Sequence, residues 1–181
     1  MAVVLQVVLP GYAQDMPSPS TPSVEALELL RSGSGLAIDA EGQFLHRGEP
    51  ITHARTLEVL WRSLAREPDG RYAVSIGREK AYVALEATPY AVRAVLPGAV
   101  SGEARGIPRL RLSDGSEELL DPASLSLGAD GVLACRVKHG QDARFTRAGQ
   151  LALGALVEED PPGSGRFALD VNGRRWPLPS R

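Results

Sequence analysis

The side chains best suited to chemistry lie in one short segment, Phe44 to His53, directly before a predicted helix. The segment contains His46, Glu49 and His53, residue types that transfer protons or bind metal ions. If Thr52 caps the helix, His53 lies in its first turn and His46 on the preceding strand, so the two imidazoles can converge. One carboxylate and two histidines form an incomplete set of zinc ligands, and we predict no metal site here.

Two other interpretations of this segment remain open. In the first, His46 and Glu49 only hydrogen-bond within a turn shaped by Gly48 and Pro50. In the second, the helix N-terminus with Arg47 and Arg55 nearby binds a small anion or carboxylate through free backbone N–H groups. An enzyme would use His46 as general base beside Glu49, whereas a binding module would use the same segment without proton transfer.

A second charged group, Arg78-Glu79-Lys80, is predicted at the tip of a hairpin. Charged residues at such a tip either remain solvated or contribute to a ligand site. No Gly-x-Ser-x-Gly motif, P-loop or dinucleotide fingerprint is present in the sequence, so we predict no cofactor and no catalytic residue. The candidate ligand-binding residues are His46, Arg47, Glu49, His53, Glu79 and Lys80.

The composition argues against several classes of partner. Twenty basic and twenty-two acidic residues give a net charge of −2, without a dense basic run, so we expect no nucleic-acid partner. The apolar run at residues 2–9 is too short for a membrane-spanning helix and has no preceding Lys or Arg, so we expect neither a signal peptide nor a membrane anchor. The one cysteine, Cys135, rules out an intrachain disulfide, and its β-like surroundings predict a buried side chain. These features favour a cytoplasmic protein.

The elements that position the candidate residues begin with a short helix after Thr21 and Pro22, with Val24, Leu27 and Leu30 on one face. Ser32-Gly33-Ser34-Gly35 ends it. Strands at residues 36–38 and 43–47 form a hairpin, and a helix from Thr52 presents Leu57, Leu60, Trp61 and Leu64 to the core. Alternating residues predict strands at 71–76, 81–85, 90–96 and 109–112.

The second half repeats the pattern of the first. Gly70-Arg71-Tyr72-Ala73-Val74-Ser75-Ile76 corresponds in kind to Gly165-Arg166-Phe167-Ala168-Leu169-Asp170-Val171. Each run comes after a predicted helix, at 52–66 and 142–159, and precedes a two-residue turn, Gly77-Arg78 or Asn172-Gly173. The sequence therefore predicts an α+β fold with two copies of a strand–helix–β-hairpin motif that share one core.

These patterns divide the chain into four parts. Residues 1–20 are expected to be disordered, or to be a mis-assigned N-terminus in which translation truly starts at Met16. Residues 21–96 form the first α+β half, residues 97–108 a linker, and residues 109–181 the second half.

The chain resembles a bacterial family known as domain of unknown function 1285 over about residues 36–178. Several groups of residues carry the resemblance: Ile38-Asp39-x-x-Gly42-x-Phe44-x-His46-x-Gly48-x-Pro50-Ile51, Asp69-Gly70-Arg71-Tyr72, Glu79-Lys80 and Leu85-Glu86-x-x-Pro89-Tyr90. The resemblance implies a small α+β fold with repeated motifs and a signalling or regulatory role. It supplies no catalytic residues.

The sequence leaves three functional hypotheses. The first is a non-catalytic binding or regulatory module that holds a small ligand or a protein segment in the groove between the two repeats. The second is a small enzyme with an acid–base site at His46 and Glu49. The third is a structural homodimer.

Overall fold

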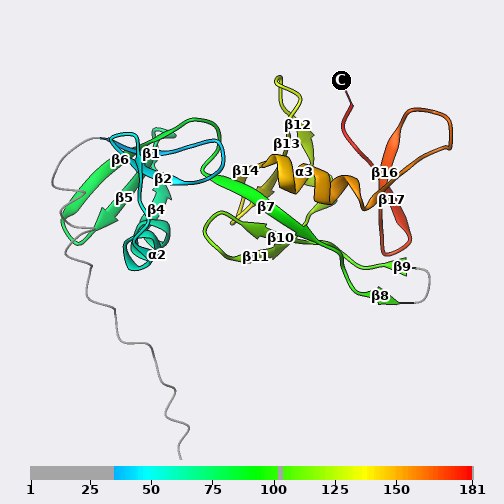
Figure 1. The fold of residues 1–181 in the computed structure, drawn as a ribbon, viewed down its shortest axis with the longest axis horizontal. Helices are drawn as coiled ribbons and strands as arrows, with labels where there is room; N and C mark the ends of the chain where they lie inside the picture. Colours follow the sequence, from blue (N-terminus) through cyan, green and yellow to red (C-terminus); the bar gives the residue numbers. More distant parts are fainter. Residues whose placement is uncertain (1–34, 102–103, 181) are drawn as a thin grey trace, which may run out of the picture.

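The computed structural model describes residues 35–101 and 104–180. The described part is mostly β-sheet, with two α-helices, α2 and α3, and one short 3-10 helix, η1. Three of its sheets succeed one another along the long axis of the molecule, and the smallest, β8–β9, lies beside the last of them (Figure 1). The predicted α+β class is confirmed in this broad sense. The helix predicted after Thr21 and the whole of residues 1–20 lie outside the described residues.

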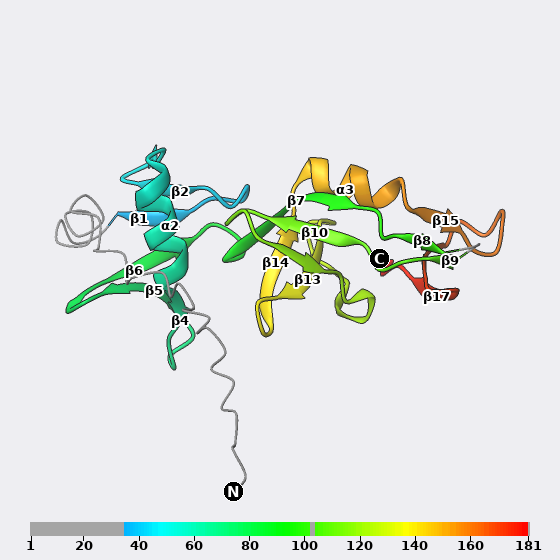
Figure 2. The same ribbon diagram turned by 90° about the horizontal axis from the view of Figure 1, so that it is seen from below.

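The first sheet consists of two three-stranded antiparallel units. Its strands, in the order β3-β2-β1-β6-β5-β4, are β1 Leu36–Ile38, β2 Phe44–His46, β3 Glu49–Pro50, β4 Leu64–Arg66, β5 Tyr72–Ile76 and β6 Glu79–Leu85. The two units join where β1 and β6 pair in parallel, with Ala37 opposite Ala84. The helix α2, Ala54–Ser63, connects the units and lies across one face of the sheet (Figure 2).

The helix α2 starts one residue later than the sequence suggests. His53 rather than Thr52 is its N-cap, because the His53 side chain accepts a hydrogen bond from the backbone N–H of Thr56. At the other end, Leu64 is extended and opens β4. The 3.6-residue period therefore buries Thr56, Val59 and Leu60 against the sheet.

The second sheet repeats the topology of the first. Its strands, in the order β11-β10-β7-β14-β13-β12, are β7 Tyr90–Leu96, β10 Arg109–Leu112, β11 Glu117–Leu119, β12 Ser126–Leu127, β13 Leu133–Val137 and β14 Gln141–Phe145. Here β7 and β14 form the parallel pair that joins two antiparallel units. The connection between the units is the 3-10 helix η1, Pro122–Ser124.

A third, three-stranded sheet comes after the second helix. The helix α3, Arg147–Gly154, leads into β15 Val157–Glu159, β16 Phe167–Val171 and β17 Arg174–Pro177. The strand pairs β4–β5 and β15–β16 have the same register. In each pair, the last residue of the first strand faces the aromatic residue that opens the second: Arg66 faces Tyr72, and Glu159 faces Phe167. The two-residue turns predicted at Gly77-Arg78 and Asn172-Gly173 are both present, since Ile76 faces Glu79 and Val171 faces Arg174.

The helix predicted at 142–159 is much shorter in the structure. Residues Gln141–Phe145 form β14, a central strand whose Ala143 and Phe145 are buried. The helix begins only after Thr146, whose hydroxyl accepts a hydrogen bond from the N–H of Gly149 at 3.1 Å. Polar and apolar residues alternate within Gln141–Phe145 over only a few positions, and pairing with β7 and β13 makes this segment a strand.

The buried residues form two clusters, one against each six-stranded sheet, instead of the single shared core that we predicted. The first cluster includes Phe44 and Leu60, and the second includes Leu110 and Phe145. Trp61 packs against both clusters. Its ring contacts Phe44 edge-on at 4.6 Å and stacks on Tyr90 at 5.5 Å between centroids. Two cores form because different elements cover each sheet: α2 contributes Leu60 to the first cluster, whereas α3 contributes Leu153 and β16 contributes Leu169 to the second.

The boundary between the halves differs from the predicted linker at 97–108. The strand β7 pairs only with strands of the second sheet, so the chain changes sheets at residues 86–89. Residues 97–108 contain the small hairpin of β8 Val100–Ser101 and β9 Ala104–Arg105. Among the described residues, no helix is long and apolar enough to cross a membrane.

Candidate functional site

The face of the first sheet opposite α2 is the candidate site. Side chains alternate across a strand, and Ala81 and Val83 of β6 are buried under α2. Lys80, Tyr82 and Ala84 therefore point to the opposite face, and Tyr82 is 45% exposed. We call this surface the outer face of the first sheet.

The outer face is hollowed into a groove of about 840 Å³. At its centre, the small side chains of Ala37 and Ala84 lie opposite each other on the parallel pair β1–β6. Among the described lining residues, three are basic and none is acidic. The lining consists of Gly35, Leu36, Ala37, Arg47, Gly48, Gly70, Arg71, Tyr72, Lys80, Ala81, Tyr82, Val83, Ala84 and Leu85. The groove thus combines an apolar floor with a cationic rim.

Arg71 holds the aromatic side of this rim. Its guanidinium carbon lies 3.8 Å from the centre of the Tyr82 ring. The Arg71 Nε donates a hydrogen bond to Asp69 at 2.9 Å, and this bond lowers the pKa of the Asp69 carboxyl. Asp69 therefore stays ionised and orients the guanidinium over the ring.

Lys80 is positioned in a similar way by a carboxylate outside the groove. Its Nζ lies 2.6 Å from Glu67, and the hydrogen bond between them raises the pKa of Lys80. The same ammonium lies 5.7 Å from the centre of the Tyr82 ring. Because the ion pair lies at the surface, it fixes the position of the charge more than it stabilises the fold.

Two of the six predicted site residues, Arg47 and Lys80, meet in this groove. Arg47 lies in the two-residue turn between β2 and β3, and its φ of 53° is in the left-handed region. Its backbone N–H donates to the carbonyl of Gly35 at 2.7 Å. This bond ties the turn to the start of β1 and holds Arg47 at the edge of the groove.

The other four predicted residues do not line the groove. His46 and Glu49 face each other across β2 and β3, so the structure brings this pair together. By alternation, His46 shares the inner face with Phe44, and Glu79 shares it with Ala81. His53 is the N-cap of α2, and its Nδ1 also lies 2.9 Å from the Thr56 hydroxyl. His53 therefore occupies the helix terminus that an anion would use.

Arg71 and Tyr82 line the groove but are not among the predicted site residues. The period of two in β6 was the available signal, since it places Tyr82 on the face of Lys80. The cation–π contact of Arg71 depends on the pairing of Ala73 with Tyr82, which local sequence does not specify.

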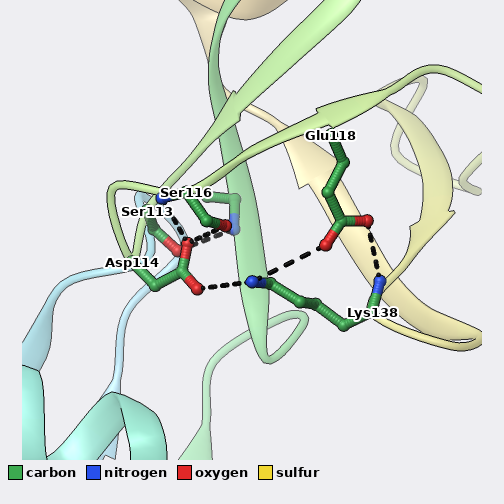
Figure 3. A network of polar contacts seen from close by, with 6 residues as sticks. Ser113, Asp114, Ser116, Glu118 and Lys138 are labelled. Carbon is green, nitrogen blue, oxygen red and sulfur yellow. Dashed lines mark hydrogen bonds and ion pairs between the residues drawn. The ribbon is translucent and has the colours of Figure 1, made fainter. Parts of the chain in front are cut away.

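A second polar group lies where the two six-stranded sheets meet (Figure 3). The Nζ of Lys138 contacts Asp114 at 2.9 Å and Glu118 at 3.6 Å. Burial by itself raises the pKa of Asp114, but hydrogen bonds from Ser116 and Lys138 outweigh burial and hold this pKa below its usual value. The Ser113 hydroxyl accepts a hydrogen bond from Ala91 at 3.1 Å. These groups satisfy one another, which is typical of a structural contact.

The single thiol lies in the second core cluster. The prediction that Cys135 is buried is confirmed, and burial raises the pKa of its thiol to about 12. Within residues 35–101 and 104–180, the structure has no group of three or more His, Cys, Asp or Glu side chains that could hold a metal ion.

Comparison with known proteins identifies similar folds. No family model matches the chain, and no curated protein matches it. A DUF1285 family protein from Silicibacter pomeroyi DSS-3 is similar over 81% of this chain and 80% of its own, with 20% identity and a TM-score of 0.63. A DUF1285 family protein from Shewanella baltica OS155 is 18% identical over 63% of this chain and 85% of its own, with a TM-score of 0.48. The resemblance found from the residues is thus confirmed at the level of the fold: the chain has the fold of the DUF1285 family protein from Silicibacter pomeroyi.

Proposed function

We propose that this protein is a non-catalytic binding module whose ligand lies in the groove on the outer face of the first sheet. The observation that carries the proposal is the lining of this groove. Its floor is apolar, and its described lining residues include three basic side chains and no acidic one. Binding sites are typically concave and mostly apolar, with a few well-placed polar groups. A regulatory or signal-transduction role fits a module of this kind.

The groove favours a ligand with a flat apolar body and one anionic group. Ala37 and Ala84 leave space over the floor, and the exposed Tyr82 ring offers a surface for stacking. Arg47 and Lys80 supply positive charge for a carboxylate or phosphate at the rim. A protein segment with an acidic side chain presents the same chemistry.

The proposal includes three finer statements about the protein. The chain is a member of the DUF1285 family, it acts in the cytoplasm, and the two units of a helix with a three-stranded sheet are copies of one motif. The matching positions of Tyr72 in β5 and Phe167 in β16 support the last statement.

One observation favours the alternative, an enzyme that uses His46 and Glu49. These residues lie opposite each other on β2 and β3. Against it, Glu49 is exposed and neither residue lines the groove. Catalysis usually requires an acid–base pair inside a cleft, so we favour the binding module.

A thermal-shift screen of the full chain tests the proposal. The compounds are aromatic and aliphatic carboxylates and phosphates, nucleotides, amino acids and metal salts. A ligand present at 100 times its dissociation constant stabilises the protein by about 2.7 kcal/mol, so we expect the melting temperature to rise by about 5 °C or more.

Variants of the rim locate the binding site. Lys80→Ala and Arg47→Ala should each abolish most of this shift. Arg111→Ala is the matched control, since it breaks a comparable exposed ion pair, with Glu117 at 2.9 Å, on the second sheet. A shift that survives in both rim variants would place the ligand elsewhere. A shift lost in His46→Ala alone would favour the enzyme.

A further inference from the structure

We propose that the third sheet carries a second ligand site, which binds a small carboxylate or phosphate with an apolar body. The site is a groove of about 570 Å³ lined by the third sheet, the C-terminal residues after it and the β12–β13 hairpin. We call it the groove beside the third sheet. It shares no lining residue with the groove on the first sheet, so the two sites can be tested separately.

The three-stranded units β4-β5-β6 and β15-β16-β17 place matching residues in the two grooves. Gly70-Arg71-Tyr72 at the start of β5 corresponds to Gly165-Arg166-Phe167 at the start of β16, and each triplet lines its groove. Lys80 of β6 faces the fourth residue of β5, and Arg175 of β17 faces the fourth residue of β16. An arginine, an aromatic residue and a second basic residue therefore line a groove at the same place on both units.

In both units, acidic residues partly neutralise the second basic residue. A carboxylate oxygen of Glu67, directly after β4, lies 2.6 Å from Lys80 Nζ. A carboxylate oxygen of Asp160, directly after β15, lies 3.7 Å from Arg175 Nη1. Glu158 lies 3.6 Å from Nη2 of the same guanidinium. The arginine that opens the next strand is therefore the cation by which the two grooves differ.

The difference lies in the residue two positions before this arginine. In the first unit, Asp69 accepts hydrogen bonds from the backbone N–H of Arg71 at 3.0 Å and from its Nε at 2.9 Å. In the third sheet, the Ser164 hydroxyl accepts the corresponding backbone N–H of Arg166 at 3.1 Å but supplies no negative charge. Within the part of the chain that the structure describes, the Arg166 guanidinium has no hydrogen bond, ion pair or ring contact.

This guanidinium is suited to hold the anionic group of a ligand. Its planar fork of N–H donors matches the two oxygens of a carboxylate or phosphate, which it binds in a bidentate manner. Arg175 adds positive charge to the same lining, where Asp160 is the acidic residue among those described. The groove thus attracts an anion, and the unused donors of Arg166 supply the contact.

Apolar side chains of the lining provide a surface for the body of the ligand. Phe167 is 50% exposed, although it lines the groove, so its ring is available for stacking. The half-buried Leu133 of β13 and Leu178 after β17 line the same groove. Small-molecule sites typically enclose about 300–1,000 Å³, and this groove lies within that range. Its size and lining therefore suit an aromatic ring that carries one acidic group.

NMR titration of the full chain tests the site. Phenylacetate and phenyl phosphate carry a carboxylate and a phosphate on the same ring, and phenylacetamide has the shape of phenylacetate without its charge. We expect at least one of the two anions, at millimolar concentration, to shift the backbone amide resonances of residues 165–168. Phenylacetamide should bind about tenfold more weakly or less. No shift at residues 165–168 with either anion would overturn the proposal, and the tighter anion identifies the acidic group.

Arg166→Gln tests the role of the guanidinium. We expect this variant to raise the dissociation constant of the anion about tenfold or more, because it removes the charge and the bidentate contact. Arg147→Gln is the matched control, since Arg147 is also exposed but lies on α3 outside the groove. It should bind the anion as the wild type does. Equal dissociation constants in the two variants would overturn the assignment of Arg166.

Ser164→Asp tests the difference between the two units. The new carboxylate takes the position that Asp69 has in the first unit and pairs with Arg166. We expect it to weaken anion binding about threefold or more while the guanidinium remains in place. Ser164→Asn, which adds an amide of the same size without the charge, should retain wild-type affinity. Equal weakening in both variants would contradict the role of the unused donors.

Lys80→Ala separates this site from the groove on the first sheet. Lys80 lines only that groove, so the variant should leave the anion-induced shifts at residues 165–168 unchanged. Loss of these shifts in Lys80→Ala would overturn the second site. Shifts at residues 80–84 without shifts at residues 165–168 would mean that the second site is wrong and the proposed function holds. Shifts at residues 165–168 alone would support the second site and count against the proposed function.

Discussion

The two six-stranded sheets have the same strand topology but place their helices differently. In the first sheet, α2 connects the two antiparallel units and covers one face. In the second sheet, the 3-10 helix η1 makes this connection, and α3 comes after the last strand and packs on β7 through Gly149. A Cβ on Gly149 would lie 2.3 Å from the carbonyl oxygen of Val92, so the helix contacts the strand at its backbone. Both sheets are therefore built around one parallel strand pair, whereas the helix occupies a different place in the strand order of each sheet.

The sheets also differ in how they use the antiparallel unit that comes after a helix. The unit after α2, β4-β5-β6, joins the first sheet through β1, whereas the unit after α3, β15-β16-β17, remains a separate sheet. The same local pattern therefore completes a sheet in one place and forms its own in another. The first sheet gains a long strand, β6, whose outer face carries the groove.

The largest predicted effect tests whether the two cores fold as one. Phe44 and Phe145 are both buried, one in each cluster. We expect Phe44→Ala and Phe145→Ala each to lower the free energy of unfolding by about 3–5 kcal/mol, measured by urea denaturation. Because Trp61 packs against both clusters, we expect each variant to unfold in a single transition.

Phe167→Ala is the control for this comparison. Phe167 is 50% exposed, so its removal should cost about 1 kcal/mol or less. Two separate transitions in Phe44→Ala, with the second at the wild-type midpoint, would show that the cores are independent.

A smaller effect tests the contact between the sheets. Gly42 has a φ of 71°, and a Cβ there would lie 2.4 Å from the Cβ of Ser113, in the turn between β10 and β11 of the second sheet. Gly77 has a similar φ of 63°, but a Cβ there has nothing within 4 Å. We expect Gly77→Ala to lower the free energy of unfolding by about 1–2 kcal/mol, because of backbone strain alone. Gly42→Ala should lower it by about 1–3 kcal/mol more than Gly77→Ala, because the new Cβ also clashes with Ser113.

Thermal or urea unfolding of both glycine variants measures this difference. Equal losses of stability would mean that the first sheet moves away from Ser113 without cost.

The smallest effect concerns pH. The pKa of Asp114 is held below its usual value in the folded protein, so its contribution to stability is present above about pH 4 and is lost as the pH falls through the folded pKa. We expect Asp114→Asn to lower the free energy of unfolding by about 1 kcal/mol at pH 7 and to flatten the loss of stability below pH 4. In the first sheet, Arg71 also lowers the pKa of Asp69, but this pair is more exposed to solvent, so we expect a smaller effect on stability there.

Urea denaturation between pH 3 and pH 7 measures this dependence. Lys138→Met removes the ammonium that lies 2.9 Å from Asp114, and it should shift the loss of stability to higher pH. An unchanged pH profile in both variants would contradict the assigned role of the contact.

Elements whose side chains repeat at a fixed local period were predictable from the residues alone. The hairpin of β1 and β2, most of α2, the matching strands β5 and β16 and their two-residue turns could all be predicted from alternation, capping residues and turn residues. The burial of Cys135 was predictable from its β-like neighbours. Of the candidate site, the sequence supplied Arg47 and Lys80.

How these elements combine depends on strand pairing between distant parts of the chain. The parallel pairs β1–β6 and β7–β14 join residues that are far apart in the chain, and no local pattern encodes such a pairing. These pairs made Gln141–Phe145 a strand, placed β7 in the second sheet, and separated the core into two clusters. They also brought Arg47, Lys80 and Tyr82 to one groove. A groove depends on which strands become neighbours, and the free energy that selects those neighbours comes from burial of the whole sheet.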